Sequence, residues 1–325
     1  MSVHLLCPQE ADPGGLTQAR QTLLPCLPAA SAQAARVVVA VGWHTAAERL
    51  LRQVGPGQRR VMWSHGLGSL VFYRSRPLAA LVRWLSRLPQ LLQVVATLRH
   101  CDALVVAYPR RSWWDPRSVD VALAHRFGVP VAVIGNPIDT QFWCPGPSRA
   151  QDSTVLSIGR LEWQKGHEGA LRIVAQLHGA TKLCVLAPAS ARYEQQLRQL
   201  AAHEKASDRL LFRFGLTAEQ RRQELQQALC LLSWSETEYQ SLAMLEALAC
   251  GCPVVARPRG WLCHGTVPGV LVVQSRREAA RVIQALQQQP RWRERLAAAG
   301  RAYVCQQHGL PAVALQWRRV LADLA

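Results

Sequence analysis

The sequence predicts an α/β protein built from two doubly wound parallel-sheet domains that face one another across a cleft. Short apolar runs alternate with helical patterns along the whole chain, and the apolar runs are nearly continuous, as in strands buried on both faces of a parallel sheet. The alternation is interrupted at residues 139–152, where Pro, Gly, Ser and polar residues accumulate. A segment of this composition is typical of an interdomain linker.

The expected elements follow the same order in both halves of the chain. In the first half we expect strands at residues 3–7, 36–41, 60–64, 103–106 and 129–134, and helices at 16–24, 45–54, 78–98 and 118–127. In the second half we expect strands at 154–158, 182–186, 210–214, 230–233, 253–256 and 270–273, and helices at 168–178, 191–204, 218–229, 241–249, 276–288 and 311–324. We therefore assign a first domain to 1–139, a linker to 140–152 and a second domain to 153–310, followed by a C-terminal helix within 311–325.

The composition indicates a globular protein of the cytoplasm. The chain of 325 residues is 49% hydrophobic and 18% charged, as in soluble proteins with room for two domains. No run reaches the roughly 18 uncharged apolar residues of a membrane-spanning helix. The apolar run at 4–8 lacks a basic start, so we interpret it as a strand and not as a signal peptide. The ten cysteines are scattered, which favours buried thiols in a reducing compartment over a metal site.

The charge predicts an anionic partner. A formal net charge of +17 fits nucleic acid, a membrane surface or phosphorylated substrates. Only three of the 38 Lys and Arg residues are lysines, namely Lys165, Lys182 and Lys205. Each lysine is therefore more informative than usual.

The strongest local pattern lies at residues 157–167, where an expected strand ends and an expected helix begins. Gly159 permits a backbone turn, and the loop after it carries Arg160 and Lys165. Two fixed cations beside such a turn can clamp a pyrophosphate. A solvated loop with incidental charges is the alternative interpretation.

A second pattern runs from residue 232 to residue 259. Glu238 lies in the loop that follows an expected strand, and Glu246 lies within the next expected helix, among apolar neighbours that disfavour a solvated position. The helix starts at Ser241 and Leu242, so its first backbone N–H groups can bind phosphate between the two carboxylates. Glutamates are suited to accept hydrogen bonds from vicinal hydroxyls, although Glu246 could also be an ordinary residue of an amphipathic helix.

The two patterns together resemble glycosyltransferase family 4, a retaining family with two Rossmann-like domains in the GT-B architecture. The matching residues of the first motif are Gly159, Arg160, Lys165 and Gly166, and those of the second are Ser235, Glu238, Glu246, Ala247, Gly251, Pro253, Val254 and Val255. The resemblance covers residues 136–256 well and is thin elsewhere.

The resemblance implies roles for these residues. Arg160 and Lys165 would hold the donor diphosphate, Glu238 would contact the donor sugar, and Glu246 would contact the ribose. The segment 212–216, which includes Phe214, is similar to the loop beside the nucleobase, and 136–142 resembles the family's interdomain hinge. The C-terminal helix would pack back on the first domain. Retention at the anomeric carbon and no essential metal are also implied.

The sequence departs from the family pattern in three places. Residues 239–241 are Tyr-Gln-Ser where the family often has Gly-Phe-Gly, which implies a differently shaped sugar pocket. Pro137 replaces the usual glycine of the hinge segment, and paired glycines are missing near Gly260.

The first domain carries two weaker candidates. Gly14 and Gly15 follow the first expected strand, as the family's glycine loop near the donor phosphates does, but a pair of glycines after a proline is also an ordinary turn. His65 ends another expected strand, where a similarly placed histidine of the family touches the donor sugar and leaving phosphate. A lone histidine is otherwise more often structural.

A basic stretch in the first domain predicts contact with an anionic membrane surface. Between Arg49 and Cys101 there are nine arginines and no acidic residue, and the part from Arg74 to Arg99 has apolar residues at helical spacing. Such a helix suits the inner membrane surface, with about 1 kcal/mol for each well-placed cation. A cationic helix that packs in the core is the alternative, and no sequence motif supports nucleic-acid binding.

The leading hypothesis is a hexosyltransferase that moves a sugar from a nucleotide-diphosphate donor to a hydroxyl of a glycolipid or growing polysaccharide. One alternative is a catalytically silent nucleotide-sugar-binding or scaffold protein of the same fold. A nucleic-acid-binding protein is a third, although neither alternative explains the spacing of Arg160, Lys165, Glu238 and Glu246.

Overall fold

The computed structural model describes the chain as two compact units. The described residues are 2–6, 19, 21–27, 30–31, 34–42, 51, 54–64, 88–108, 119–147, 153–179, 181–187 and 190–324. The first unit contains the described residues of Met1–Pro137 and Leu310–Ala325, and the second contains those of Ile138–Gly309. Most of the predicted helix at 45–54, and residues 78–87 of the predicted helix at 78–98, lie outside the described residues.

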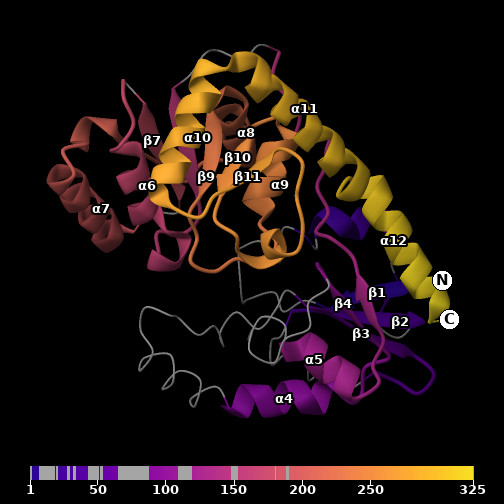
Figure 1. Ribbon diagram of the computed structural model, residues 1–325. Coiled ribbons are helices and arrows are strands. Elements are labelled where there is room, and N and C mark those ends of the chain that lie inside the picture. The colour runs from indigo at the N-terminus through magenta and orange to yellow at the C-terminus, as the bar shows by residue number, and fades with distance from the viewer. Residues whose placement is uncertain are drawn as a thin grey trace. The chain divides into compact units, whose positions relative to one another are not determined.

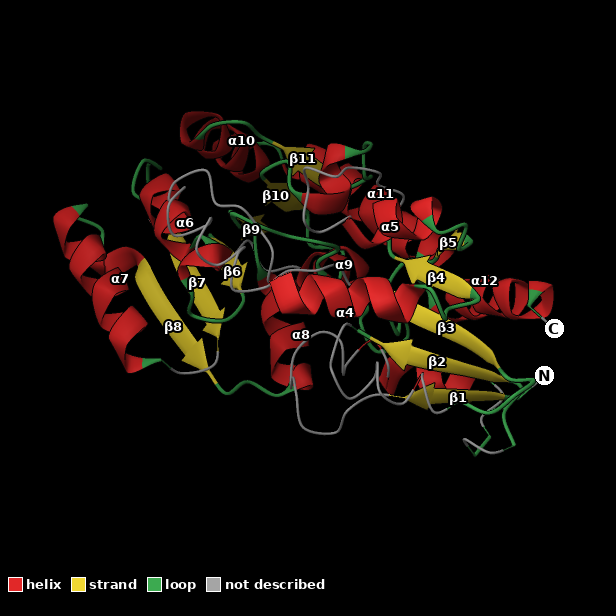
Figure 2. Ribbon diagram, turned by 90° about the horizontal axis from the view of Figure 1, so that it is seen from below, coloured by secondary structure: helices red, strands yellow, loops and turns green. Residues whose placement is uncertain are grey.

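The first unit is a parallel sheet whose strands follow the order of the chain. In the described residues its five strands are β1 (Val3–Leu6), β2 (Val37–Val41), β3 (Arg59–Ser64), β4 (Ala103–Val106) and β5 (Val131–Val133). Each strand pairs in parallel with the next, beginning with Val3 opposite Val37, and β1 to β4 lie side by side in that order in Figure 2. Each of these strands overlaps a strand that the apolar runs predict.

Helices cover both faces of this sheet. The helices are α4 (Leu88–Leu98), α5 (Val119–Arg126), the 3-10 turn η1 (Leu24–Cys26) and α12 (Leu310–Asp323). Alternate strand residues point to opposite faces, so Val38 and Met62 pack with α4 and α5, while Val39 and Trp63 pack with α12. The indole of Trp317 meets that of Trp63 edge to face at 5.2 Å, which fixes the C-terminal helix on the first sheet.

The second unit is a six-stranded parallel sheet with a different strand order. Its strands are β6 (Thr154–Ile158), β7 (Lys182–Ala187), β8 (Leu210–Phe214), β9 (Cys230–Ser233), β10 (Val254–Ala256) and β11 (Val270–Val272). They lie in the order β11-β10-β9-β6-β7-β8. Three of them, β6, β8 and β9, coincide with their predicted ranges to the residue.

Helices flank the second sheet (Figure 1). They are α6 (His167–Val174), α7 (Ala191–His203), α8 (Ala218–Gln227), α9 (Leu242–Ala249), α10 (Arg276–Gln288) and α11 (Pro290–Gln307), with short 3-10 turns η3 (Trp163–Lys165), η4 (Ser207–Arg209) and η5 (Gly260–Cys263). On one face α6 and α10 pack on each other and on the strands, and α7 packs on α6. On the other face α8 contacts β6, and α9 contacts β9 and β10.

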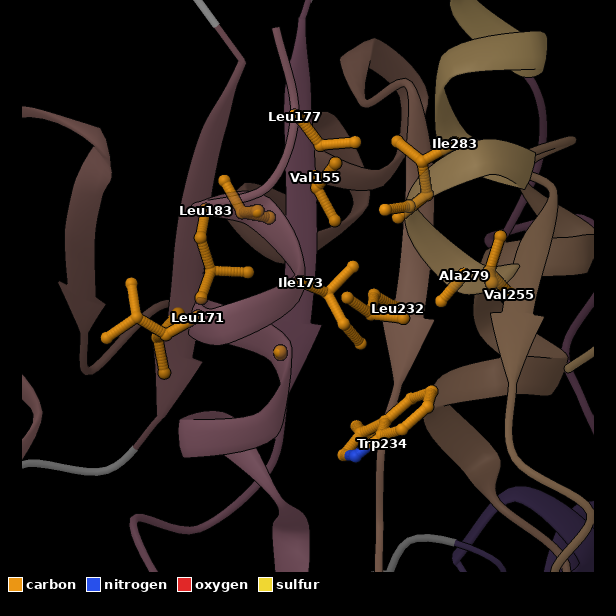
Figure 3. Packing of buried hydrophobic residues seen from close by; sticks show 14 of the residues in the cluster. Val155, Leu171, Ile173, Leu177, Leu183, Leu232, Trp234, Val255, Ala279 and Ile283 are labelled. Atoms are coloured by element: carbon orange, nitrogen blue, oxygen red, sulfur yellow. The ribbon is translucent and has the colours of Figure 1, made fainter. Parts of the chain in front are cut away.

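The core of the second unit lies between the sheet and the layer of α6 and α10. Figure 3 shows strand residues such as Val155 and Leu232 directed toward Ile173 of α6 and Ile283 of α10, all with less than 1% exposure. Burial of each such side chain contributes about 1.5–3 kcal/mol. Trp234 lies at the lower end of this core, directly after β9, so the loop that follows β9 starts from a fixed position.

Two features of the second unit differ from the expectation. The helix α11, of 18 residues, was not predicted. The segment 138–144, of which residues 140–144 were expected as linker, is held on the second unit, since Arg301 donates to the carbonyls of Thr140 and Trp143 at 2.8 and 2.6 Å. The chain enters and leaves this unit at adjacent points, because the Ile138 N–H donates to the His308 carbonyl at 2.7 Å.

The cysteines of the described residues are free thiols. No disulfide joins them, and Cys184, Cys230, Cys250 and Cys252 are buried. None of the helices described above is long and apolar enough to cross a membrane.

Candidate functional site

The strand order of the second sheet changes direction between β6 and β9. From β6 the chain proceeds outward to β7 and β8, and it then returns to the other side of β6 to add β9, β10 and β11. The loops that follow β6 and β9 diverge from the C-terminal ends of these strands. Open parallel sheets bind ligands at such a point. The loops 159–166 and 234–241 start here and carry both predicted motifs, so this edge is the candidate site.

Two glycines shape the loop after β6. Gly166 has a φ of +69°, and a Cβ atom at this residue would lie 2.1 Å from the carbonyl oxygen of Trp234. Only glycine fits this turn, since the backbone is left-handed and another chain segment lies against it. At Gly159 a Cβ atom would lie 2.9 Å from Cγ of Lys165. The aliphatic part of the lysine therefore crosses directly over the strand end.

The loops after β6 and β9 are joined by a backbone hydrogen bond and by an ion pair. The N–H of Glu236 donates to the carbonyl of Gln164 at 2.8 Å. Nζ of Lys165 donates to Oε2 of Glu238 at 3.2 Å. The structure thus brings together one cation of the first motif and one carboxylate of the second, at the predicted edge of the sheet.

The ion pair remains accessible from solvent. The side chains of Lys165 and Glu238 are 26% and 12% exposed, respectively. An ammonium group carries three N–H donors, and an ionised carboxylate has several acceptor positions, so both groups can bind a ligand while paired. The pair therefore offers adjacent positions for an anion and for hydroxyl groups.

Arg160 lies on the same loop, and its side chain pairs with a different carboxylate. Its guanidinium is 65% exposed and lies 3.2 Å from the carboxylate of Glu162. The structure therefore places Arg160 on the site loop in an ion pair of its own. Such an exposed ion pair contributes little to stability.

A buried histidine that the sequence motifs did not single out supports the loop. His167 is the first residue of α6; its Nδ1 lies 2.8 Å from Oγ of Ser157, and its Nε2 lies 3.1 Å from the Arg160 carbonyl. Burial lowers the pKa of His167 to about 4, so the ring is neutral at pH 7. Because a carbonyl only accepts, Nε2 carries the proton and Nδ1 accepts from the serine hydroxyl. The position directly after Lys165-Gly166 is the only sequence signal for this role.

The helix α9 begins close to the carboxylate of the second loop. Ser241 is its N-cap and accepts a hydrogen bond from the N–H of Met244 at 3.4 Å, and Leu242 is the first helical residue. The remaining N–H groups of the first turn and the helix dipole make this end suitable for an anion. The helix is buried from Met244 to Ala249, as its apolar sequence predicts.

Glu246 lies inside α9 and is 2% exposed. Its Oε1 accepts from Nη2 of Arg221 on α8 at 3.1 Å. A buried carboxylate requires such a partner, since an isolated charge is costly to bury. Sequence reasoning placed Glu246 in the interior but did not identify Arg221, which carries no motif.

The loop that carries Glu238 is in contact with the residues that follow β10. A Cβ atom at Gly260, whose φ is +57°, would lie 2.4 Å from the Glu238 carbonyl oxygen, so only glycine allows this approach. Nη1 of Arg257 lies 2.6 Å from Oε1 of Glu236, and Nε of Arg259 donates to the carbonyl of Glu236 at 3.0 Å. These contacts fix the backbone on either side of the carboxylate that the site uses.

The other predicted site residues lie farther away or outside the described residues. Phe214 ends β8, which is separated from β6 by β7, and its ring stacks on Phe212 at 5.5 Å. Gly14, Gly15 and His65 lie outside the described residues. Within the ranges that the structure does describe, no group of three or more His, Cys, Asp or Glu side chains is arranged to hold a metal ion.

The sequence of this unit resembles a known protein family. Residues 145–303 match the family model Glycosyl transferases group 1. The matched segment contains both loops of the candidate site, together with α8, α9 and their ion pair. Comparison with curated proteins gives no sequence match.

Solved structures of glycosyltransferases have the same fold as the whole chain. HepE of Anabaena, determined in complex with UDP and glucose, has a TM-score of 0.73 at 16% identity, and the alignment covers 99% of this chain and 100% of that one. Sucrose-phosphate synthase of Thermosynechococcus elongatus has a TM-score of 0.70 at 20% identity, over 89% and 74% of the two chains. A glycosyltransferase of Rickettsia africae has a TM-score of 0.66 at 11% identity, over 98% and 84%. The fold is that of the two-domain GT-B glycosyltransferases, as the sequence predicts.

Proposed function

We propose that the protein is a retaining glycosyltransferase that moves a hexose from a nucleoside-diphosphate-sugar to a hydroxyl acceptor. The observation that carries the proposal is the ion pair between Lys165 and Glu238, at the point where the strand order reverses and within the segment that matches group 1 glycosyltransferases. An accessible cation and an accessible carboxylate are the two groups that a sugar diphosphate needs side by side. The N-terminus of α9 adds backbone donors for the phosphates.

Each group of the site has a role in this proposal. Lys165, Arg160 and the N–H groups after Ser241 and Leu242 bind the diphosphate and stabilise the charge that develops on it. The exposed guanidinium of Arg160 then exchanges its contact with Glu162 for the phosphate. Glu238 accepts hydrogen bonds from the sugar hydroxyls, as an ionised carboxylate does.

The remaining predicted site residues complete the donor pocket. Glu246 accepts the ribose hydroxyls, and Phe214 contributes to the nucleobase side. His65 contacts the sugar and the leaving phosphate from the first domain, and Gly14 and Gly15 approach the phosphates.

The reaction transfers the sugar with retention at its anomeric carbon. The bond between the anomeric carbon and the phosphate oxygen breaks, and its electron pair remains on the diphosphate. The acceptor oxygen forms the new bond on the same face of the sugar, and its proton passes to the departing phosphate oxygen. The fixed cation and the helix N-terminus supply the charge stabilisation, so we expect activity without added metal.

The acceptor is a glycolipid or a growing polysaccharide at the cytoplasmic surface of the inner membrane. The arginine-rich stretch around Arg74 to Arg99 supports this part of the proposal. Within the described part of this stretch, the apolar residue Leu92 of α4 is 64% exposed, as a helix on a membrane surface requires. Binding to anionic vesicles that disappears when Arg83 and Arg87 are replaced by glutamine tests the membrane contact.

The experiment that tests the function starts with a panel of UDP-, GDP- and ADP-sugars in a thermal-shift assay. The stabilising donor is then used to measure sugar release and transfer. Lys165→Ala and Glu246→Ala should each abolish turnover while the far-UV circular dichroism spectrum stays unchanged. Full activity in either variant contradicts the proposal.

The same measurements separate the alternatives. A scaffold protein of this fold would bind the nucleotide diphosphate and release no sugar from any donor. A nucleic-acid-binding protein would instead show an affinity for DNA or RNA that falls steeply with salt.

A further inference from the structure

The buried carboxylate of Glu246 belongs to a series of contacts within the second unit. Its side chain is 3% exposed, and it accepts from Nη2 of Arg221 at 3.1 Å. Glu246 comes from α9 and Arg221 from α8, so the ion pair also joins the two helices on this face of the sheet. The orientation of the carboxylate therefore depends on where Arg221 is held.

Arg221 is held from its other side by an aromatic ring. The guanidinium carbon of Arg221 lies 5.1 Å from the centre of the Trp143 ring, in the geometry of a cation–π contact. Trp143 belongs to the segment 138–144, which directly follows the crossing from the first unit, and it is 4% exposed. Arg221 thus lies between Glu246 and this segment and contacts both.

The position of Trp143 is itself fixed on α9. Nη1 of Arg301, on α11, donates to the Trp143 carbonyl at 2.6 Å and to the Ala249 carbonyl at 2.9 Å. Ala249 is the last residue of α9, the helix that carries Glu246. The contacts therefore form a closed ring from Glu246 through Arg221, Trp143 and Arg301 back to α9.

We propose that Arg221 is a positioning residue for donor binding, which orients the Glu246 carboxylate toward the ribose hydroxyls and is itself oriented by Trp143. The inference rests on the proposed function, because it takes Glu246 as the ribose acceptor. It goes beyond that function in assigning a role to a residue outside both motifs. It also connects the donor site to the segment that enters the second unit.

The chemistry of the contact favours arginine over lysine at this position. A guanidinium is planar, so it can lie over an indole ring and donate to a carboxylate from its edge at the same time. A lysine would retain the charge but would lose the stacking and the fixed direction. The conservative variant Arg221→Lys should therefore restore donor affinity only in part.

The experiment measures the dissociation constant of the nucleoside diphosphate that binds best among UDP, GDP and ADP, together with donor KM and kcat. Arg221→Met, which keeps the length and removes the charge, should raise Kd and KM by about tenfold or more. The variant lacks the charge-assisted hydrogen bond that orients Glu246, so donor binding is weakened equally in the ground state and in the transition state. The value of kcat should stay close to that of the wild type. Trp143→Leu should produce a smaller change in the same direction.

A double-mutant cycle with Glu246→Gln separates positioning from an independent effect. If Arg221 acts through Glu246, the variant that carries both substitutions should bind no more weakly than Glu246→Gln alone. Arg222→Met is the matched control, since Arg222 lies on the same helix and contacts the same segment through the ring and carbonyl of Phe142. Its Kd should stay within about twofold of the wild type, as is usual for substitutions away from a site.

The outcomes distinguish a failure of the positioning role from a failure of the proposed function. Unchanged Kd in Arg221→Met, or losses that multiply in the double variant, would overturn the positioning role while the glycosyltransferase remains. A wild-type protein that binds none of the three diphosphates and transfers no sugar overturns the proposed function, and the inference with it. Thermal unfolding of every variant shows whether a loss of binding reflects a loss of fold.

Discussion

Lys165 and Glu238 are 73 positions apart in the chain, and their side chains meet at 3.2 Å. Neither residue is placed by the other. Lys165 is positioned by the turn between Gly159 and Gly166, and Glu238 by the backbone that packs on Gly260. The two loops are therefore fixed by different contacts, and their side chains still meet. The ion pair is the place where the two loops come together.

The ion pair can be tested by reversing it. The double variant Lys165→Glu with Glu238→Lys keeps opposite charges at the two positions, and an ion pair that solvent still reaches contributes about 0–1 kcal/mol, so the stability should change little. The value of kcat/KM should fall by about 100-fold or more, because the cation no longer lies where the phosphate needs it. Urea unfolding and sugar-transfer kinetics are the two measurements. A reversed pair that retains full turnover would show that the pair is structural only.

Gly166 should be among the least replaceable residues of the site loop. In Gly166→Ala the backbone is strained and the new methyl group collides with the Trp234 carbonyl, which should lower the free energy of unfolding by roughly 3 kcal/mol or more. Gly179 is the matched control, since its φ is +80° but no atom lies within 4 Å of an added Cβ. Gly179→Ala should cost only about 1 kcal/mol, the strain of the left-handed backbone alone. Equal costs at both positions would contradict the close approach of the two loops.

His167 predicts a pH dependence of stability on the acid side. Its pKa is lowered from 6.5 to about 4, so the folded state binds no proton between these values while the unfolded state does. The contribution of His167 to the free energy of unfolding is therefore fully present above about pH 6.5. It is lost as the pH falls toward about 4, by roughly 3 kcal/mol in total. His167→Gln, which can keep one donor and one acceptor, should remove this part of the slope. Urea unfolding between pH 4 and 8 measures the difference, and parallel curves for both proteins would count against it.

Trp317 should stabilise the first unit without affecting donor binding. Its indole is fully buried against Trp63, so Trp317→Ala should lower the free energy of unfolding by about 3–5 kcal/mol through the cavity it leaves. The exposed Leu315 on the same helix is the control, and Leu315→Ala should be within about 0.5 kcal/mol of the wild type. Below the unfolding transition, the Kd of the nucleoside diphosphate should be the same in all three proteins. A weaker Kd in the folded Trp317→Ala protein would show that the packing of α12 on the first sheet affects nucleotide binding.

Strands of both sheets could be predicted because they consist largely of consecutive apolar residues, which are almost all buried in β2, β4, β9 and β10. In β9 and β6 every predicted residue lies in the strand. The site loops could be located for the same reason, as they begin where these strands end.

The helix α11 was missed because its buried face lacks the usual pattern. Its buried residues are Arg293, Gly300 and Val304, of which only one is a large apolar residue. Gly300 lies where the helix approaches α9 closely, and a Cβ atom there would lie 2.7 Å from Cδ2 of Leu248. A glycine and a buried arginine weaken a helical prediction from sequence, although both lie on the buried face of α11.

The partners of the site residues were also beyond sequence reasoning. Arg221 and Trp143 carry no motif, and in a chain with so many arginines a single one gives no signal. Their roles arise from helix packing that brings α8 and α9 together, and helix packing depends on the whole fold. The motif residues were found because their spacing is set by one strand, one turn and one helix start.

The two crossings of the chain at Ile138 and Gly309 lie next to each other, so the second unit is an uninterrupted insertion with a common entrance and exit. A recombinant exchange of this unit with the corresponding unit of another protein of the same fold would need two junctions at neighbouring points and would leave the C-terminal helix with its own sheet. One unit can therefore be replaced while the other keeps its own sequence.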